Sequence, residues 1–306
     1  MPVRSFDELR GRARDLGPVR LAVAGGNDAS VLEAIIQAVG EGLVSAVQVT
    51  GDASAIGAAL PAALHPVVQC VEASDAADCA TKAVAAVRED RSDVLMKGHV
   101  DSTAYLRAIV SRDTGIRAGG VLSNVTVAAM PSWPKLIAAT DNGILPAPDL
   151  DQKRQIVLNT AALFRGLGVS PVKVAAVAAT EKVSAELPAT VDAAALAKES
   201  RAGNLPGFVI DGPFGYDVAV SRDAARAKGL DGSPVAGDAD LLLFPTIEAA
   251  NAVAKSWKFH GQAETGSIVL GARVPVMLNS RSDSAARRIN ALILAMVARN
   301  SGGGTT

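Results

Sequence analysis

Short, wholly apolar segments alternate with segments of helical periodicity in the first third of the chain, and this alternation constrains the fold most. The apolar segments occupy 19–24, 45–49, 67–71 and 94–96. Between the first two, apolar residues recur at spacings of three and four, which predicts a helix: Val31, Ala34, Ile35, Ala38 and Val39. Strands that are apolar throughout must be covered on both faces, so the pattern predicts a parallel sheet between layers of helices.

The pattern changes around 118–140. Two strand-like segments, 121–129 and 135–139, are separated by only a few residues, too few for a helical crossover, so we expect them to pair antiparallel. Further helices are expected at 53–64, 76–87, 149–167, 189–199, 221–228 and 285–297, and further strands at 172–178, 208–210, 240–244, 267–270 and 274–278. The sequence therefore predicts an α/β fold of two domains with mostly parallel sheets and an interdomain cleft, the first from 1–129 plus 274–306 and the second from 130–273.

Composition excludes several classes of function. At 306 residues the chain is long enough for two domains, and its net charge of −1 gives no basic field for nucleic acid. Aromatic residues make up 3%, too few for base-stacking platforms. No apolar run approaches the ~18–20 residues of a membrane helix. Two cysteines make neither a disulfide framework nor a zinc site. We expect a soluble, cytoplasmic protein that binds neither nucleic acid nor membrane.

The most informative polar turn follows the last strand. The segment 274–278 runs into 279–284, and the next residues have helical periodicity. A helix N-terminus at the carboxyl edge of a sheet favours anions. Arg281 adds a planar cation suited to phosphate or carboxylate, Ser280 adds a hydroxyl group, and Asp283 adds a potential base. The alternative is that Ser282 or Asp283 only caps the helix and Arg281 is a surface charge.

Other chemical motifs are absent or weak. The sequence contains no H-E-x-x-H, no G-x-S-x-G and no Walker A motif. The Gly25-Gly26 turn lacks the G-x-G-x-x-G spacing, and tight turns between a strand and a helix use glycine routinely. In the first half of the chain, Lys97 is the cation that lies directly at a strand end. A lysine at this position is either a site residue or a solvated surface residue.

Taken in order from about Leu21 to Val297, the turns resemble those of the phosphate acetyltransferase/phosphate butyryltransferase family, and more closely those of its butyryltransferase branch. The residues that carry the resemblance are Leu95-Met96-Lys97-Gly98 with Thr103, 121–125, Thr140-Asp141, Gly212-Pro213 with Asp217, 236–240 through Pro245, Glu248, Asn251 and Lys255, and Gly271-Ala272 through Pro275 to 280–284.

The resemblance implies reversible transfer of an acyl group between coenzyme A and inorganic phosphate. It implies two α/β domains with the cleft between them, related in fold to isocitrate and isopropylmalate dehydrogenases, usually as a homodimer. It implies no metal or redox cofactor, with coenzyme A as a substrate. Substrate contacts are expected at the matching positions: Lys97, Gly98, Thr103, Ser123, Asn124, Asp141, Gly212, Pro213, Asp217, Glu248, Asn251 and Lys255.

These residues are consistent with a mechanism in which the protein binds both substrates in a ternary complex before the acyl group is transferred. We expect Arg281 to stabilise developing charge, Ser280 to donate a hydrogen bond to the phosphate or the carbonyl, and Asp283 to accept the thiol proton. Several positions depart from the family pattern: Asn124 replaces a common histidine, Leu145 a common asparagine, and Arg287 an aspartate of the acetyltransferase branch. The alternatives are a non-catalytic acyl-CoA or phosphate binder of the same fold and a metal-dependent decarboxylating dehydrogenase.

Overall fold

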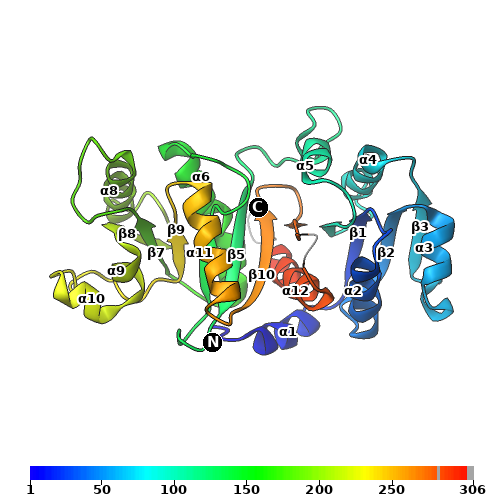
Figure 1. Cartoon of the computed structure of the whole chain (residues 1–306), viewed down its shortest axis with the longest axis horizontal. Helices are drawn as coiled ribbons and strands as arrows, with labels where there is room; N and C mark the ends of the chain where they lie inside the picture. Colours follow the sequence, from blue (N-terminus) through cyan, green and yellow to red (C-terminus); the bar gives the residue numbers. More distant parts are fainter. Residues whose placement is uncertain (281–282, 302–306) are drawn as a thin grey trace. The chain divides into compact units, whose positions relative to one another are not determined.

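The computed structural model describes residues 1–280 and 283–301 (Figure 1). The chain forms two compact units, each made from separate stretches of sequence. Unit 1 comprises Met1–Ser5 and Val121–Glu264, and unit 2 comprises Phe6–Gly120 and Thr265–Thr306. Both units are α/β, and their strands pair mostly in parallel. This confirms the fold class that the apolar strands predict.

Unit 2 has the strand order β3-β2-β1-β4-β11-β10, in which only β10 is antiparallel to its neighbour in this unit. The strands are β1 (Val19–Ala24), β2 (Val44–Gly51), β3 (Val68–Glu72), β4 (Val94–Lys97), β10 (Glu264–Leu270) and β11 (Val276–Met277). The helices are α1 (Phe6–Asp15), α2 (Ala29–Gly40), α3 (Ala53–Ala59), the 3₁₀ turn η1 (Ala62–Leu64), α4 (Ala76–Arg88), α5 (Ser102–Val110) and α12 (Ala285–Ser301).

The connections of unit 2 place helices on both faces of its sheet. The chain moves in one direction from β1 to β2 to β3, and then returns past β1 to β4. Because parallel crossovers are right-handed, the reversal puts α2 and α3 on one face and α4 on the other. α12 packs beside α2 and α1, and α4 packs beside α5. The second face of each apolar strand is therefore covered, as its sequence requires.

An aspartate begins each of the four helices that follow strands β1 to β4. Asp28 accepts hydrogen bonds from the backbone N–H groups of Ser30 and Val31. The other three aspartates each accept one such bond in the same way: Asp52 from Ala55, Asp75 from Asp78, and Asp101 from Ala104. A carboxylate at this position satisfies N–H groups that have no partner within the helix and interacts favourably with the helix dipole. The strand-to-helix turns of unit 2 are therefore fixed locally.

Unit 1 has the strand order β5-β6-β9-β7-β8. Its strands are β5 (Ser123–Ala129), β6 (Ile137–Thr140), β7 (Val172–Val177), β8 (Phe208–Phe214) and β9 (Leu241–Leu243), and its helices are α6 (Leu150–Asn159), α7 (Ala161–Leu167), α8 (Pro188–Arg201), α9 (Tyr216–Val220), α10 (Arg222–Ala227) and α11 (Ile247–Phe259). β5 and β6 pair antiparallel, with Val125 opposite Thr140, as the short connection predicts. The buried core of this unit includes the aromatic side chains of Phe214, Phe244 and Trp257.

Some element boundaries differ from those expected. The single helix predicted at 149–167 is two helices, because the backbone leaves regular helical geometry at Thr160. α1, α5 and α9 were not predicted. The chain passes between the units after Ser5, Gly120 and Glu264. The last two crossings follow from strand pairing, since β5 pairs with β6 and β10 pairs with β11. The predicted domain bounds, 1–129 plus 274–306 and 130–273, stay a prediction.

In the part of the chain that the structure describes, no helix combines the length and the hydrophobicity needed to cross a membrane.

Candidate active site

Three neighbouring parallel strands of unit 2 end at one edge of its sheet. β4 lies between β1 and β11, with Lys97 opposite Ala24 and Met96 opposite Met277. Beyond these strands come the Gly25-Gly26 turn, the Lys97-Gly98 turn and the Asn279-Ser280 turn, and each leads into a helix. The pairing of β11 with β4 therefore brings the C-terminal turn beside the end of the strand that carries Lys97.

The first two turns touch through their backbones. The N–H group of Gly98 donates to the carbonyl of Ala24 at 2.9 Å, and that of His99 donates to the carbonyl of Gly25 at 2.7 Å. A Cβ atom at Gly98 would lie 2.0 Å from the Gly25 oxygen, and one at Gly26 would lie 2.3 Å from a methyl group of Val49. Close packing therefore accounts for these glycines, and the Gly25-Gly26 turn needs no nucleotide to explain it.

Lys97 is buried, with 3% of its surface exposed. Its Nζ lies 3.5 Å from the carbonyl oxygens of both Gly98 and Asn279. It also lines a cavity of about 310 Å³ together with Val100, Asp101, Ser102, Asn279 and Ser280. Buried ammonium groups are rare unless they are paired or functional. Of the two interpretations of Lys97, the solvated surface lysine is wrong.

The turn after β11 is closed by Asp283. Its Oδ2 accepts hydrogen bonds from the N–H group of Ser280 at 2.9 Å and from the Nδ2 of Asn279 at 3.4 Å. Ser280 is exposed and Asn279 is 4% exposed. Asp283 thus holds the turn in shape, and its role as a base stays a prediction. Arg281 and Ser282, the other residues of this turn, lie outside the residues that the structure describes.

A second buried cation was missed from the sequence. Arg288, in the second turn of α12, is 3% exposed, and its NH1 donates to the carbonyl of Lys97 at 3.2 Å. Its NH2 lies 3.5 Å from the Oγ of Ser30. The sequence carried a signal for it: Arg288 precedes Leu292 and Met296 by four and eight positions, so it falls on the apolar face of the helix.

Unit 1 contains a buried polar network where β6 ends. The side-chain amide of Asn124 donates to the Oδ1 of Asn142 at 2.7 Å, and Asn142 donates to the Oγ1 of Thr126 at 2.7 Å. The Nδ2 of Asn251, on α11, donates to the Asn142 carbonyl at 3.0 Å. The Oδ1 of Asn124 is buried without a hydrogen-bond partner. Ser123 lies next to the network, and its Oγ accepts a hydrogen bond from Asn159.

Asp141 organises the loop that follows β6. Its carboxylate, 2% exposed, accepts hydrogen bonds from the backbone N–H groups of Asn124, Gly143, Ile144 and Leu145 at 2.9–3.1 Å. Burial raises the pKa of Asp141 above its usual value, and the four N–H groups offset only part of that rise. The contact from position 145 comes from the backbone. Leucine in place of asparagine at that position therefore leaves the loop intact.

The structure brings together only some of the predicted substrate-binding residues. In unit 1, Asn124, Asp141 and Asn251 belong to one network. In unit 2, Lys97 and Gly98 form one turn, and Lys97 lines the same cavity as Ser280. Thr103 is exposed on the first turn of α5 and does not line the cavity. Glu248 and Lys255 are exposed on α11.

Gly212, Pro213 and Asp217 lie at the other end of unit 1, on and after the outer strand β8. Gly212 has a positive φ of 144° and packs against β7, where a Cβ atom would lie 2.6 Å from the Ala176 oxygen. Asp217 forms an ion pair with Lys228 at 3.0 Å. These contacts give the Gly212-Pro213 motif and Asp217 a structural role in this region of the unit.

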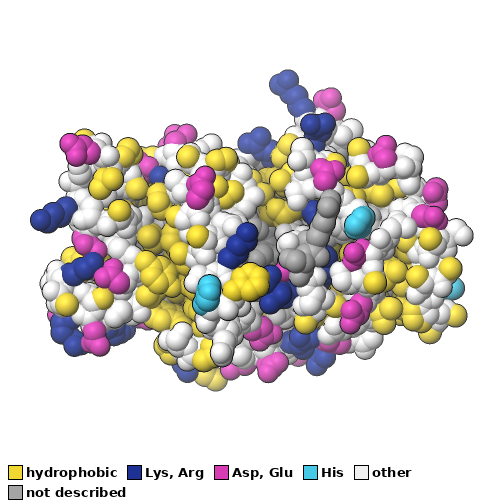
Figure 2. Space-filling model, viewed as in Figure 1, with side chains coloured by type: hydrophobic (Ala, Val, Ile, Leu, Met, Phe, Trp, Pro, Cys, Tyr) yellow, Lys and Arg dark blue, Asp and Glu magenta, His cyan; other side chains and the backbone are white. Residues whose placement is uncertain are grey.

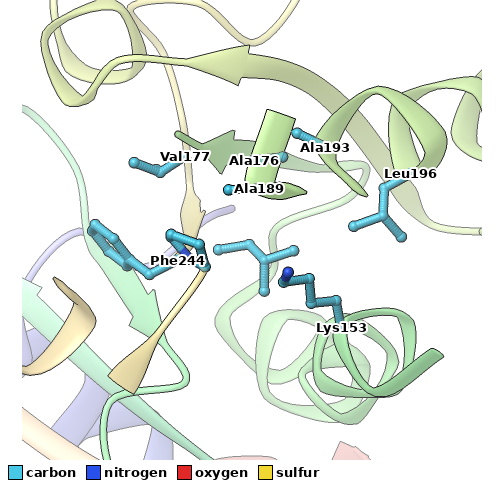
Figure 3. Close-up of a pocket in the computed structure, with 9 residues that line it drawn as sticks. Lys153, Ala176, Val177, Ala189, Ala193, Leu196 and Phe244 are labelled. Atoms are coloured by element: carbon cyan, nitrogen blue, oxygen red, sulfur yellow. The ribbon is translucent and has the colours of Figure 1, made fainter. Parts of the chain in front are cut away.

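Lys153, a third buried cation, lies in unit 1. It is 6% exposed and forms an ion pair with Asp192 at 2.6 Å. Figure 3 shows it beside a small apolar cavity lined by Val177, Leu196 and Phe244. The cavity measures about 10 Å³, room for no more than one water molecule. It is too small to hold an acyl group.

No group of three or more His, Cys, Asp or Glu side chains in the described part of the chain is arranged to hold a metal ion. On the face shown in Figure 2, cationic and anionic side chains are interspersed. This face has no continuous basic surface of the kind that binds nucleic acid.

Comparisons with known proteins identify the family of the chain. The family model described as Phosphate acetyl/butaryl transferase matches residues 67–296. The chain is 35% identical to the phosphate butyryltransferase of Clostridium beijerinckii, over 97% of this chain and 99% of that protein. It is 36% identical to the phosphate acetyltransferase of Rhizobium meliloti, over 93% of this chain and 90% of that protein. It also resembles the solved structure of a branched-chain phosphotransacylase from Enterococcus faecalis V583, with a TM-score of 0.81 and 27% identity over 92% of this chain and 99% of that one.

Proposed function

The chain belongs to the phosphate acetyl/butyryltransferase family and is a phosphate acyltransferase, and on that premise we propose that it moves a short acyl group between coenzyme A and phosphate at the carboxyl edge of unit 2. The family match over most of the chain argues against the decarboxylating dehydrogenase. A non-catalytic binder of the same fold would give the same match, and the transfer assay separates it from the enzyme. The proposal specifies a short acyl group and leaves its exact chain length and the favoured direction of transfer to the assays described below.

The observation that carries the proposal is the buried ammonium group of Lys97 beside the Asn279-Ser280 turn. The cavity that these residues line is large enough for a phosphoryl or acyl group. A cation in a site with little water interacts with a phosphate more strongly than it would in solvent. The backbone N–H groups at the start of a helix add partial positive charge at the same edge.

The reaction needs one proton transfer and one acyl transfer. The coenzyme A thiol loses its proton, its sulfur forms a bond to the carbonyl carbon of the acyl phosphate, and the bond from that carbon to the phosphate oxygen breaks. We assign stabilisation of the carbonyl oxygen and the leaving phosphate to Lys97, Ser280 and Arg281. We assign the thiol proton to Asp283, from which the leaving phosphate takes it. Holding both substrates in line contributes further, up to ~7–11 kcal/mol of the barrier in well-oriented systems.

We assign substrate contacts in unit 1 to the network at the end of β6. Asn124 supports this assignment because its Oδ1 is a buried acceptor without a hydrogen-bond partner. Asp141 acts on substrate indirectly, through the loop it holds. The remaining contacts that the family pattern suggests stay predictions: Gly98, Thr103, Ser123, Gly212, Pro213, Asp217, Glu248, Asn251 and Lys255.

A homodimer and a cytoplasmic location, both expected from the sequence, are also part of the proposal. Size-exclusion chromatography with light scattering checks the dimer, which would appear at twice the 31.1 kDa of the chain. A species that stays at the mass of one chain over the working concentration range would contradict it.

The experiment that tests the site compares two buried lysines. Lys97→Met should reduce acyl transfer on the order of 100-fold or more, since it removes a donor aimed at developing charge. It should leave the protein folded, because replacing a buried charge by an apolar group of similar volume is often neutral. Lys153→Met is the matched control. It leaves Asp192 unpaired and should lower the melting temperature while retaining the transfer rate of the folded protein.

Transfer rate and melting temperature are measured for both variants. A folded Lys97→Met protein with the wild-type transfer rate would contradict the assignment of Lys97 to the site. An equal loss of transfer rate in Lys97→Met and Lys153→Met would contradict it as well.

A further inference from the structure

Arg288 is a buried guanidinium without a carboxylate at contact distance. A guanidinium has five N–H donors. Arg288 makes two hydrogen bonds, of 3.2 Å to the Lys97 carbonyl and 3.5 Å to the Ser30 hydroxyl, and its Nε is buried without a hydrogen-bond partner. Among the described residues no Asp or Glu forms an ion pair with it. The first bond is at the upper limit of the usual range and the second is beyond it, so most of the donor capacity of Arg288 is unused.

The two carboxylates whose charges act on Arg288 accept hydrogen bonds from other residues instead. Asp28 caps α2 and accepts hydrogen bonds from Ser30 and Val31. Asp283 closes the turn after β11. Burial lowers the pKa of Arg288, and the charges of Asp28 and Asp283 raise it by less. Arginine stays protonated in proteins, so the positive charge remains and is only partly compensated.

An incompletely paired buried charge is costly to stability, and this one sits on the apolar face of α12 where a hydrophobic residue would pack. The contacts of Arg288 indicate a role that would offset this loss of stability. Arg288 donates to the main chain of Lys97, contacts the first turn of α2, and belongs to the helix that follows the Ser280 turn. It therefore connects the end of β4 with the helices that follow β1 and β11.

We propose that Arg288 is a positioning residue for phosphoryl recognition: it fixes the Lys97 strand end and adds a buried positive charge that selects the phosphoryl group over coenzyme A. The ligand class is a phosphate dianion, either inorganic phosphate or the phosphoryl group of an acyl phosphate. The inference rests on the proposed function, because it assumes that phosphate binds at the edge that carries Lys97.

The test uses Arg288→Gln, Arg288→Lys and, as a control, Arg299→Gln. Arg299 lies on the same helix, where it forms an ion pair with Asp93 at 2.9 Å, so its substitution removes the same charge at another place. The readouts are the KM values for phosphate and for coenzyme A, and the shift in melting temperature that inorganic phosphate produces in each protein without other substrates.

For Arg288→Gln we expect the KM for phosphate to rise about 10- to 100-fold, the range for losing an interaction with a charged group, while the KM for coenzyme A changes little. Its melting temperature without phosphate should equal or exceed that of the wild type, because the unpaired charge is gone. The stabilisation by phosphate should be largely lost. Arg288→Lys should restore most of the phosphate affinity, and Arg299→Gln should keep the wild-type KM for phosphate.

A purely structural role predicts a different outcome: a lower melting temperature for Arg288→Gln, with both KM values changed alike and no recovery in Arg288→Lys. That result would overturn the inference, as would a wild-type KM for phosphate in Arg288→Gln. If Arg288→Gln does not fold, the inference depends on Arg288→Lys, and a KM for phosphate raised no more than that for coenzyme A would reject it. An absence of acyl transfer in the wild type would instead reject the proposed function, and phosphate stabilisation would still report on Arg288.

Discussion

Lys97 and Arg288 show how far single residues can be interpreted before a structure is known. The sequence places Lys97 directly at a strand end, but burial decides between a site residue and a surface residue, and burial depends on the two strands that flank β4. Arg288 could have been found from its spacing to Leu292, since a charge on an apolar helix face is unusual. Nothing local in the sequence predicts that the Arg288 guanidinium reaches the Lys97 carbonyl, which is far away in the chain.

At Arg281 the prediction separates rate from stability. Arg281→Ala should lower the transfer rate on the order of 100- to 1000-fold, the usual cost of removing one donor to developing charge. Its effect on the free energy of unfolding should stay within about 0.5 kcal/mol, as for most substitutions at polar turns. Arg281→Lys should recover part of the rate, because an ammonium lacks the planar fork of a guanidinium.

Transfer rate and melting temperature measured on both Arg281 variants check this. A folded Arg281→Ala protein with a near-normal rate would mean that Arg281 is only a surface charge.

At the scale of elements, the apolar strands of unit 2 and three of its four capped helices, α2, α3 and α4, could be predicted because their signals are local. The fourth, α5, was not predicted. The antiparallel β5–β6 pair followed from the length of its connection. The break at Thr160 could not be predicted, because apolar periodicity continues from α6 into α7. α1 was missed because charged residues surround its three buried positions, Phe6, Leu9 and Ala13.

The contact between the first two turns of unit 2 leads to a prediction for Gly98. Gly98→Ala places a methyl group against the Gly25 backbone, which cannot rotate away as a side chain can. We expect a loss of about 1–3 kcal/mol in the free energy of unfolding, the range for overpacking, and a lower transfer rate because the turn carries Lys97. Gly57→Ala in α3 is the control, since nothing lies within 4 Å of its added methyl group and alanine favours the helix.

Chemical denaturation measures both glycine variants. Equal stability of Gly98→Ala and the wild type would show that the two turns can separate freely.

At the scale of the whole molecule, fold and reaction class could be predicted from the order of several individually weak turns along the chain. The family match over residues 67–296 and the pairing of β11 with β4 confirm that interpretation. Acyl preference could not be predicted, because it depends on the walls of a cavity rather than on any motif. Arg281 and Ser282 lie outside the residues that the structure describes, so the chemistry assigned to them still rests on sequence.

The most direct test of the account is thiol release from acetyl-, propionyl- and butyryl-CoA by the wild-type protein, with and without inorganic phosphate. We expect release that depends on phosphate, with acyl phosphate formed in equal amount, and a preference among the three substrates that reports chain length. The rate should persist in EDTA and without nicotinamide, as the family resemblance implies. Three results would contradict the account. They are thiol release at the same rate with and without phosphate, no thiol release from any of the three substrates, and activity that EDTA abolishes and Mg²⁺ restores.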